Sequence, residues 1–500
     1  MPSRVSRRQF LGTVAAGAAG LALSRVAWQQ PARPPNIVLI FSDDQGYAEM
    51  GCQGCTDIAT PNLDAICSAG VRCTSGYVTC PVCSPSRAGL LTGRYQQRFG
   101  HEHNPGAAPE AGLPLTETTL ADRLKAAGYA TGLVGKWHLG MLPEQHPMSR
   151  GFDEFFGFLH GAHSYLRPND SATDPLLRGR EPVQESEYLT DAFAREACGF
   201  IDRHVADPFF LYLAFNAVHS PLEASQRYLD RFEGIADPNR RTFAGMLSAM
   251  DDAVGDVLAT LRRHDLERDT LVIFISDNGG PTSQTTSSNA PLRGYKAQVY
   301  EGGIRVPFAV RWPGRLPAGT VYDRPVSSLD VVPTVLTATG ADLPTGLDGV
   351  DLAPHLSGTN AAVAHEQLCW RMGRKTAIRR GDWKLLREAQ GDFELYHLAE
   401  DIGERNDLAA TEPTRVAELR DALAAWDARM VEPLWVRESF GNQGGNLRQR
   451  FEQLDEDGDG RLSPDEAPTE QWFRRADTDG DGFVSLDEAR AATRAGNQGR

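Results

Sequence analysis

A cysteine and an arginine lie four residues apart in the run 83–87, which reads Cys-Ser-Pro-Ser-Arg. A helix tolerates Pro85 in its first turn, and Ser84 could cap that turn, so we expect Cys83 at a helix N-terminus. The positive end of the helix dipole favours a negatively charged group at that place. The run therefore predicts a nucleophile, which could be a thiolate or the hydrate of an aldehyde made from the cysteine.

Carboxylate and amide side chains follow two apolar runs. Asp43 and Asp44 come after the run 36–41, and Asp277 and Asn278 come after the run 271–275. Four hard oxygen donors suit Ca²⁺ or Mg²⁺ better than zinc. Either pair alone could simply begin a turn, but the two pairs together predict a metal site.

Lysine is rare in this chain, because the 51 cationic side chains include only five lysines. Two of them, Lys136 and Lys296, lie in polar segments that contain glycine. A compact ammonium can act as a point charge toward a tetrahedral oxyanion, and its pKa can shift where that of arginine cannot. We therefore predict that both lysines bind an anion, against the alternative of solvated surface charges.

Four apolar runs rich in β-branched residues should position these groups, at 36–41, 130–134, 209–215 and 271–275. Each predicts a buried parallel strand that ends at polar residues, and helical patterns lie between them at 119–127 and 241–263. Strands that alternate with helices predict an α/β fold whose ligands lie at the carboxyl ends of the strands. The polar clusters should therefore meet at one edge of the sheet.

The run 83–94 resembles the signature of the type I sulfatase family, Cys-x-Pro-Ser-Arg followed by Leu-x-Thr-Gly-Arg. The resemblance extends over about residues 36–430 and includes the arylsulfatase and N-acetylgalactosamine-6-sulfatase branch. It implies an alkaline-phosphatase-like α/β fold, with a large mixed sheet flanked by helices and a small C-terminal antiparallel sheet. It also implies a sulfuric ester hydrolase that acts on a sulfated carbohydrate or another sulfate ester.

The same resemblance implies the cofactors. A formylglycine-generating enzyme would oxidise Cys83 to formylglycine, whose hydrate supplies the oxygen that attacks sulfur. Asp43, Asp44, Asp277 and Asn278 would bind a catalytic Ca²⁺ together with the modified residue 83.

The resemblance further implies a role for each remaining polar residue of the site. Lys136 and Lys296 would hold the sulfate group, and Arg87 would hold the formylglycine hydrate in place. His138 would form a hydrogen bond with that hydrate, and His219 would lie near the leaving oxygen. A histidine or a lysine would protonate the departing alcohol.

The substrate pocket is harder to predict. We expect the segments 152–157 and 160–165 to border it, with His163 either contacting a sugar or packing within its loop. Because one fold can serve several chemistries, a phosphodiesterase or phosphonate monoester hydrolase remains an alternative. A calcium-binding scaffold with a degenerate enzyme lobe is a second alternative, from a different class of protein.

Further segments follow the catalytic domain, which we place at residues 34–364. Short alternating runs and a helical pattern over 413–430 predict a small antiparallel sheet with a packing helix, in a subdomain at 365–435. A stretch rich in Gly, Asn and Gln then predicts a linker at 436–449.

Residues 450–495 carry two acidic motifs that begin 22 residues apart. Each has oxygen donors at positions 1, 3 and 5, Gly at 6, an apolar residue at 8 and Glu at 12, as a Ca²⁺ loop requires. A merely acidic tail would not repeat in register, so we predict a paired EF-hand-like module in which calcium is structural. The predicted calcium residues are Asp455, Asp457, Asp459, Arg461, Glu466, Asp477, Asp479, Asp481, Phe483 and Glu488.

Residues 1–30 predict a signal peptide, because two arginines at 7 and 8 precede a small-residue apolar run at 12–23. The paired arginines favour the twin-arginine translocase over an ordinary secretory route, and the apolar run is too short for a permanent membrane span. The formal charge of −15 argues against nucleic acid as a partner. We therefore expect an exported, periplasmic or extracellular protein, in which disulfides among the eight cysteines are permitted.

Overall fold

The computed structural model describes residues 33–105, 111–389 and 391–435, and residues 451, 454, 461–464, 473, 476–486, 488 and 489 of the C-terminal part. The chain forms two compact units, residues 1–435 and 436–500. The predicted signal peptide, the predicted linker and four predicted calcium ligands, Asp455, Asp457, Asp459 and Glu466, lie outside the described residues.

A large mixed sheet forms the centre of the first unit, with the strand order β11-β2-β10-β9-β1-β8-β4-β5-β6-β7 in the described part of the chain. The neighbouring strands β9, β1, β8, β4 and β5 are parallel, and β10 is antiparallel to β9. The four predicted strands all lie in the parallel part. The strand bounds are β1 Asn36–Ser42, β2 Val71–Cys73, β4 Ala130–Lys136, β5 Glu154–Phe158, β6 Leu177–Arg178, β7 Glu181–Pro182, β8 Phe209–Ala214, β9 Thr270–Ser276, β10 Phe308–Arg311 and β11 Thr320–Tyr322.

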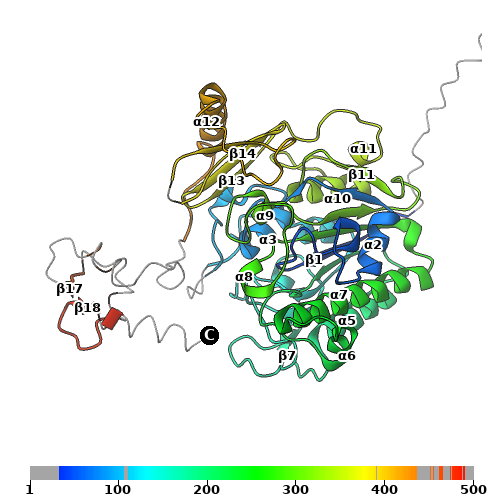
Figure 1. Cartoon of the computed structure of the whole chain (residues 1–500). Helices are drawn as coiled ribbons and strands as arrows, with labels where there is room; N and C mark the ends of the chain where they lie inside the picture. Colours follow the sequence, from blue (N-terminus) through cyan, green and yellow to red (C-terminus); the bar gives the residue numbers. More distant parts are fainter. Residues whose placement is uncertain are drawn as a thin grey trace, which may run out of the picture. The chain divides into compact units, whose positions relative to one another are not determined.

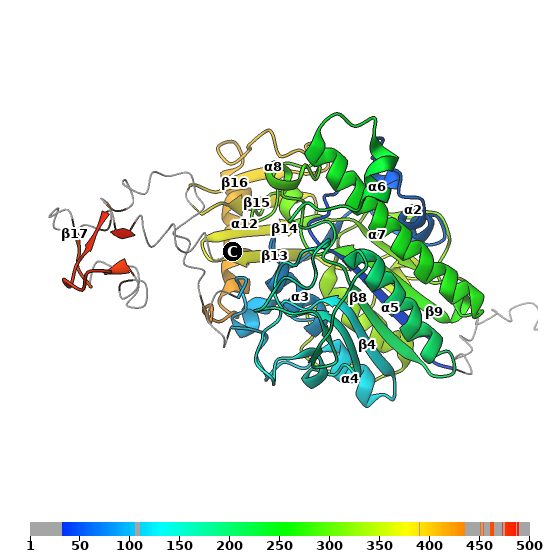
Figure 2. The same cartoon turned by 90° about the horizontal axis from the view of Figure 1, so that it is seen from below.

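Helices cover both faces of this sheet, as Figures 1 and 2 show. One face packs against α2 (Pro61–Ser68), α5 (Leu189–Arg203) and α7 (Pro238–Arg263). The other packs against α3 (Cys83–Thr92), α4 (Leu120–Ala126) and α10 (Val331–Thr339).

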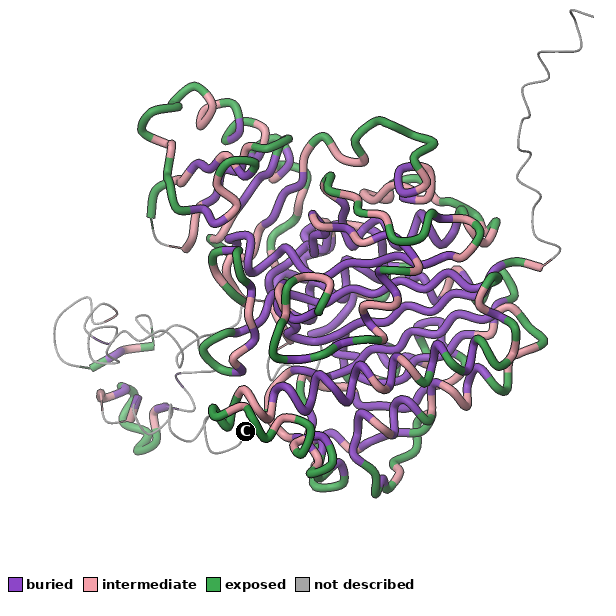
Figure 3. Tube along the Cα trace, turned by 45° about the vertical axis from the view of Figure 1, so that its right-hand side comes forward, coloured by how far each residue is buried: buried purple, intermediate pink, exposed green. Residues whose placement is uncertain are grey.

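Strand β1 is buried on both faces, as the purple centre of the sheet in Figure 3 illustrates. Val38 and Ile40 face one layer of helices, and Ile37, Leu39 and Phe41 face the other. This double burial explains why the strand appears in the sequence as an unbroken apolar run. The predicted α/β fold with a large mixed sheet is confirmed.

A small antiparallel sheet follows in chain order, with β13 (Gln367–Met372), β14 (Lys375–Arg380), β15 (Trp383–Arg387) and β16 (Glu394–His397). One face packs against Leu419, Leu423 and Trp426 of α12 (Pro413–Asp427). The opposite face packs against Val299, Tyr300 and Ile304. The small sheet is therefore enclosed between α12 and the segment 299–304.

In the second unit, β17 (Arg461–Leu462) pairs antiparallel with β18 (Val484–Ser485). Leu462 lies opposite Val484, and both are buried in a small apolar cluster with Phe451 and Phe473. Leu462 and Val484 occupy the apolar eighth positions of the two predicted loops. The two predicted loops therefore contribute to one apolar cluster.

The segment 152–157, which we expect to border the substrate pocket, lies partly in the large sheet. Residues 154–158 form β5, an inner strand paired with β4, and Phe155 and Phe156 are buried in the core. The aromatic residues of the segment 152–157 therefore pack inside the protein, and the expectation that this segment borders the substrate pocket stays a prediction. Among the described helices, none combines the length and the apolar character needed to cross a membrane.

Candidate active site

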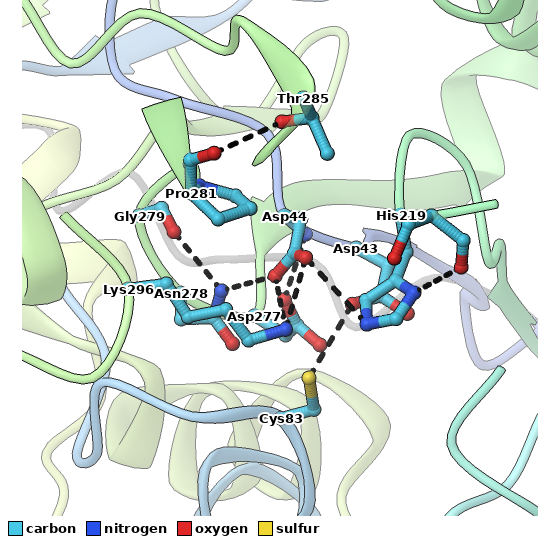
Figure 4. A network of polar contacts seen from close by, with 12 residues as sticks. Asp43, Asp44, Cys83, His219, Asp277, Asn278, Gly279, Pro281, Thr285 and Lys296 are labelled. Carbon is cyan, nitrogen blue, oxygen red and sulfur yellow. Dashed lines mark hydrogen bonds and ion pairs between the residues drawn. The ribbon is translucent and has the colours of Figure 1, made fainter. Parts of the chain in front are cut away.

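The carboxyl ends of β1 and β9 bring four oxygen-bearing side chains together (Figure 4). Asp43 and Asp44 follow β1, and Asp277 and Asn278 follow the adjacent parallel strand β9. The backbone N–H of Asp44 donates to Oδ1 of Asp277 at 3.1 Å, and Nδ2 of Asn278 donates to Oδ1 of Asp44 at 2.6 Å. All four residues are buried. The register of two neighbouring strands thus assembles the predicted metal ligands.

Cys83 is the first residue of α3 and points at this cluster, as Figure 4 shows. Its Sγ lies 3.5 Å from Oδ1 of Asp43. One ligand atom each from Asp43, Asp44, Cys83 and His219 lies within 4.8 Å of the other three. The helix therefore places the predicted nucleophile against the predicted metal site.

Ser84 does not cap this helix, and the expectation that it would is wrong. Val82, with extended backbone angles, occupies the N-cap position and makes no side-chain capping bond. The Ser84 hydroxyl instead contacts the carbonyl oxygen of His138 at 2.6 Å and Nε2 of His101 at 2.7 Å. Because Ser84 is already inside the helix, its side chain links α3 to the segment that carries His138.

The four oxygen-bearing side chains fit a hard divalent cation. Oδ1 of Asn278 is buried and has no hydrogen-bond partner among the described residues. A buried carbonyl oxygen without a partner costs free energy, and coordination to a metal would remove that cost. Together with the carboxylates of Asp43, Asp44 and Asp277 it forms a set of oxygen donors of the kind that Ca²⁺ or Mg²⁺ prefers.

Three cationic side chains surround the carboxylates. Lys136 pairs with Asp43, and Arg87 lies 2.9 Å from Oδ2 of Asp277. Lys296 lies 2.8 Å from Oδ1 of Asp44. Buried charges require such partners. Because the three positive groups balance the three carboxylates, a divalent cation and an anionic ester can enter together without a large net buried charge.

The carboxylates differ in their affinity for protons. Burial raises the pKa of Asp43, but the charges of Lys136, His219 and Arg87 outweigh it and leave the pKa below its ordinary value. Burial and the charge of Asp43 raise the pKa of Asp277. Asp43 is therefore the stronger acid of this neighbouring pair.

Burial also raises the pKa of the Cys83 thiol, although Lys136 and Lys296 act in the opposite direction. An unmodified Cys83 would therefore remain a neutral thiol near pH 7, and only the thiolate is a good nucleophile. The site favours chemistry that does not depend on a thiolate.

Two histidines border the cluster. His138 has a positive φ of 60°, and its Nδ1 is buried without a hydrogen-bond partner in the described part of the structure. Burial and the charges of Lys136 and Arg87 place its pKa well below the ordinary value. Nδ1 of His219 lies 2.6 Å from the carbonyl oxygen of Ser220 and must donate to it, so Nε2, 3.6 Å from Asp44, carries the lone pair.

The loop after β5 covers His138. A Cβ atom at Gly161 would lie 2.7 Å from Cε1 of the His138 ring, so only glycine allows this approach. His163 is buried, and its ring nitrogens lie 3.2 Å and 3.1 Å from the carbonyl oxygens of Ser164 and Asp174. This geometry supports the loop-packing role of His163 over a sugar contact.

Tyr165 lies in the segment 160–165 that we expect to border the pocket, but it has a supporting role that the sequence did not indicate. Its hydroxyl contacts the carbonyl oxygens of Asn216 and His219, at 2.5 Å and 2.8 Å. It therefore fixes the loop that carries His219. Tyr165 lies 54 residues before His219 in the chain, so no local sequence pattern indicates this contact.

In the second unit, Asp477, Asp479 and Asp481 form another acidic group that could hold a metal ion. The backbone N–H of Gly482 donates to Oδ2 of Asp477 at 3.2 Å, and its positive φ of 87° makes the sharp turn expected at the sixth position. Glu488 accepts from the backbone N–H of Thr478 at 2.9 Å, which closes the loop. The remaining predicted residues, Phe483 and Arg461, lie at the seventh positions of their loops.

Family models match most of the chain. The model described as Sulfatase matches residues 35–341, and the one described as N-sulphoglucosamine sulphohydrolase, C-terminal, matches residues 295–427. An EF hand model matches residues 447–466 and 469–490.

Several individual proteins are similar to the chain. Human arylsulfatase A is 39% identical over 372 residues, which cover 68% of this chain and 71% of the relative. The N-acetylgalactosamine-6-sulfatase of Sus scrofa is 36% identical, with 64% of this chain and 66% of the relative covered. The solved structure of Ps i-CgsB in complex with k-i-k-neocarrahexaose has 35% identity and a TM-score of 0.78, covering 81% of this chain and 96% of that chain.

Proposed function

This chain belongs to the sulfatase family of sulfuric ester hydrolases, and from that premise we propose that it removes sulfate from carbohydrates, using formylglycine made from Cys83 and a bound Ca²⁺. The observation that carries the proposal is the position of Cys83, at the start of α3 and 3.5 Å from Asp43. A carbohydrate substrate is supported by one relative, named an N-acetylgalactosamine-6-sulfatase, and by the oligosaccharide bound to Ps i-CgsB.

The metal would be held by Asp43, Asp44, Asp277 and Asn278, with residue 83 beside them. When bound, Ca²⁺ supplies positive charge that offsets the charge developing on the sulfate oxygens. Lys136 and Lys296 add point charges on the same cluster, and each already pairs with a carboxylate there. These groups orient the ester and hold its sulfur against residue 83.

Formylglycine, as its hydrate, supplies an oxygen nucleophile that a buried thiol of raised pKa does not provide. Arg87 bonds to Asp277 and to the carbonyl oxygen of Lys136, at 2.9 Å and 3.2 Å, so its charge stays fixed behind the nucleophile. Nδ1 of His138, which has no hydrogen-bond partner among the described residues, would be available for a hydrogen bond to the hydrate. Lys296 carries a proton that it can deliver to the departing alcohol, whereas His219 could do so only after its Nε2 is protonated.

The test uses a panel of sulfated oligosaccharides and an aryl sulfate with the native protein and its Cys83→Ala and Cys83→Ser variants. Mass spectrometry of the native peptide around residue 83 should show an aldehyde in place of the thiol. Both variants should fold normally and lose at least about 10³-fold in kcat/KM, because the nucleophile is gone.

Two results would contradict the proposal. Sulfatase activity that survives in Cys83→Ala would exclude the nucleophile. A large preference of the native protein for an aryl phosphate diester, which is also a singly charged tetrahedral ester, would favour phosphodiester chemistry instead.

Export is part of the same proposal. Residues 1–30 would direct the enzyme through the twin-arginine translocase to the periplasm or beyond. That route carries folded proteins, so a formylglycine-generating enzyme would act on Cys83 before export. Replacing Arg7 and Arg8 together by lysine should retain active, modified enzyme in the cytoplasm, as cell fractionation would show.

A further inference from the structure

We infer that the small sheet positions Lys296 for its reaction, through Lys375 and Glu388. Nζ of Lys375 donates to the carbonyl oxygen of Ala297 at 2.6 Å and lies 3.0 Å from Oε2 of Glu388. Oε1 of Glu388 accepts from the backbone N–H of Val299 at 2.8 Å. The ion pair of Lys375 and Glu388 thus bonds to one carbonyl group and one N–H group within the three residues that follow Lys296. The inference rests on the proposed role of Lys296 in binding sulfate.

Ala297 lies at the centre of this arrangement. Its φ of 70° is in the left-handed region, which costs free energy for alanine and persists only where the surroundings enforce it. Its backbone N–H donates to the carbonyl oxygen of Pro81 at 2.8 Å, two residues before Cys83. Ala297 is therefore held on one side by the segment that leads to the nucleophile and on the other by Lys375.

The far end of the same segment is held by a second lysine. Nζ of Lys384 is fully buried between Oε1 of Glu301 at 2.9 Å and Oε1 of Glu404 at 2.8 Å. The backbone N–H of Glu301 donates to Oε2 of Glu404 at 2.7 Å. The segment 296–301 therefore begins at a site lysine and is bonded to the small sheet along its length.

The positions of the five lysines agree with a supporting role for Lys375. Lys136 and Lys296 lie in the site, Lys375 and Lys384 hold the segment behind it, and the fifth lysine is Lys125. Lys125 is half exposed on α4 and pairs with Asp153 at 2.7 Å. In a chain that otherwise uses arginine, four of the five lysines contact the site or its support. Lys125 provides a matched control.

The experiment compares Lys375→Met, Lys375→Arg and Lys125→Met with the native enzyme. The measurements are kcat/KM on an aryl sulfate, inhibition by inorganic sulfate, and the rise in Tm that inorganic sulfate causes.

Misplacement of a binding group by about 1 Å can lower the rate of an enzyme about 10²-fold. We expect Lys375→Met to lose about 10- to 100-fold in kcat/KM and to bind sulfate at least about 10-fold more weakly, with an unchanged Tm in the absence of sulfate. Lys375→Arg should recover part of both losses, and Lys125→Met should match the native enzyme.

The affinity for sulfate distinguishes a positioning role of Lys375 from an effect on stability alone. Partial unfolding would lower the amount of active enzyme, but the folded fraction would bind sulfate with unchanged affinity. The inference is overturned if Lys375→Met binds sulfate and turns over substrate as Lys125→Met does. A native enzyme that cleaves no sulfate ester would instead remove the proposed function.

A contact between two thiols supports a second, independent inference: we propose that Cys52 and Cys67 form a disulfide. Their Sγ atoms lie 3.3 Å apart, one in the short helix 51–53 and one in α2. The backbone N–H of Cys52 donates to Oδ1 of Asp64 at 2.8 Å, which holds the two elements together. Sγ of Cys55, Cys80 and Cys83 contacts oxygen atoms instead.

In this step each thiol loses a proton, an Sγ–Sγ bond forms, and two electrons pass to a disulfide oxidoreductase or a small-molecule disulfide, which becomes a dithiol. Pairing would also remove two of the six thiols that lie between residues 52 and 83 of the sequence, where the thiol of Cys83 itself is required for the proposed maturation.

Peptide mapping of the exported enzyme without reductant tests this pairing. The linked peptides containing residues 52 and 67 should appear, and Cys67→Ala should lower Tm by several degrees, whereas Cys198→Ala should not produce a free thiol at Cys52. Complete alkylation of Cys52 and Cys67 in the native exported enzyme would overturn the proposal.

Discussion

At the scale of single residues, Gly161 lies directly against the ring of His138. The His138 ring lies so close that a methyl group at residue 161 would be 2.7 Å from it. Gly161→Ala should therefore displace the ring and lower kcat by about 10-fold, in line with the cost of small misplacements at a reacting centre. Steady-state kinetics and Tm would be measured together.

A variant with Ala at the exposed Gly234 is the control, because no other atom of the described residues lies within 4 Å of a Cβ at that position. If Gly161→Ala retains native kcat, the ring of His138 is not held by this loop.

At the scale of elements, the junction between the small sheet and the segment 296–301 should make stability depend on pH. Burial raises the pKa of Glu404 to about 7 from an ordinary 4.5, with Lys384 opposing and Glu301 adding to the shift. A pKa raised in the folded state contributes stability that is present below pH 4.5 and is lost as the pH rises through 7.

Glu301 behaves in the opposite way. Burial raises its pKa, but Lys384, Arg305 and Arg379 outweigh burial and lower it to about 2. Its contribution is present above the ordinary value and is lost only as the pH falls toward 2. Between pH 5 and 8 the pH dependence of this junction therefore comes from Glu404.

Glu404→Gln removes that titration. The free energy of unfolding of the native enzyme should fall between pH 5 and pH 8. We expect the fall to be smaller in the variant, by on the order of 2 kcal/mol. Urea unfolding at both pH values, with calcium in excess, measures the difference. Parallel pH profiles for the two proteins would contradict the assignment.

At the scale of the whole molecule, the proposed function would use calcium in each of the two compact units. A variant that ends at Trp435 lacks the EF-hand unit and keeps every residue of the candidate active site. We expect it to retain kcat/KM within about twofold, because units with their own cores generally fold alone. EGTA should inactivate the full chain and the shortened chain alike, and added Ca²⁺ should restore both.

Full-length Asp477→Asn is the matched control, since it alters only the described acidic loop of the second unit. A shortened enzyme that has lost its activity or its response to calcium would show that the second unit takes part in catalysis.

Much of the candidate site was predictable from local sequence. Its signals are either continuous in the sequence or compositional: the run 83–87, the pairs Asp43-Asp44 and Asp277-Asn278, and the rare lysines. Because parallel strands end at a common edge, these residues were expected to meet. The four predicted strands were correct because an apolar run of that length, closed by polar residues, has few other stable arrangements.

The sequence by itself therefore determined the fold class, the family and the identity of the residues that meet at the site. Only the tertiary structure decided that Ser84 joins α3 to His138, that residues 154–158 are core, that Gly161 lies against a histidine and that Lys375 bonds to the residue after Lys296. The physical reason is distance along the chain: these contacts join residues separated by tens of positions, and packing and register specify them, whereas local patterns do not.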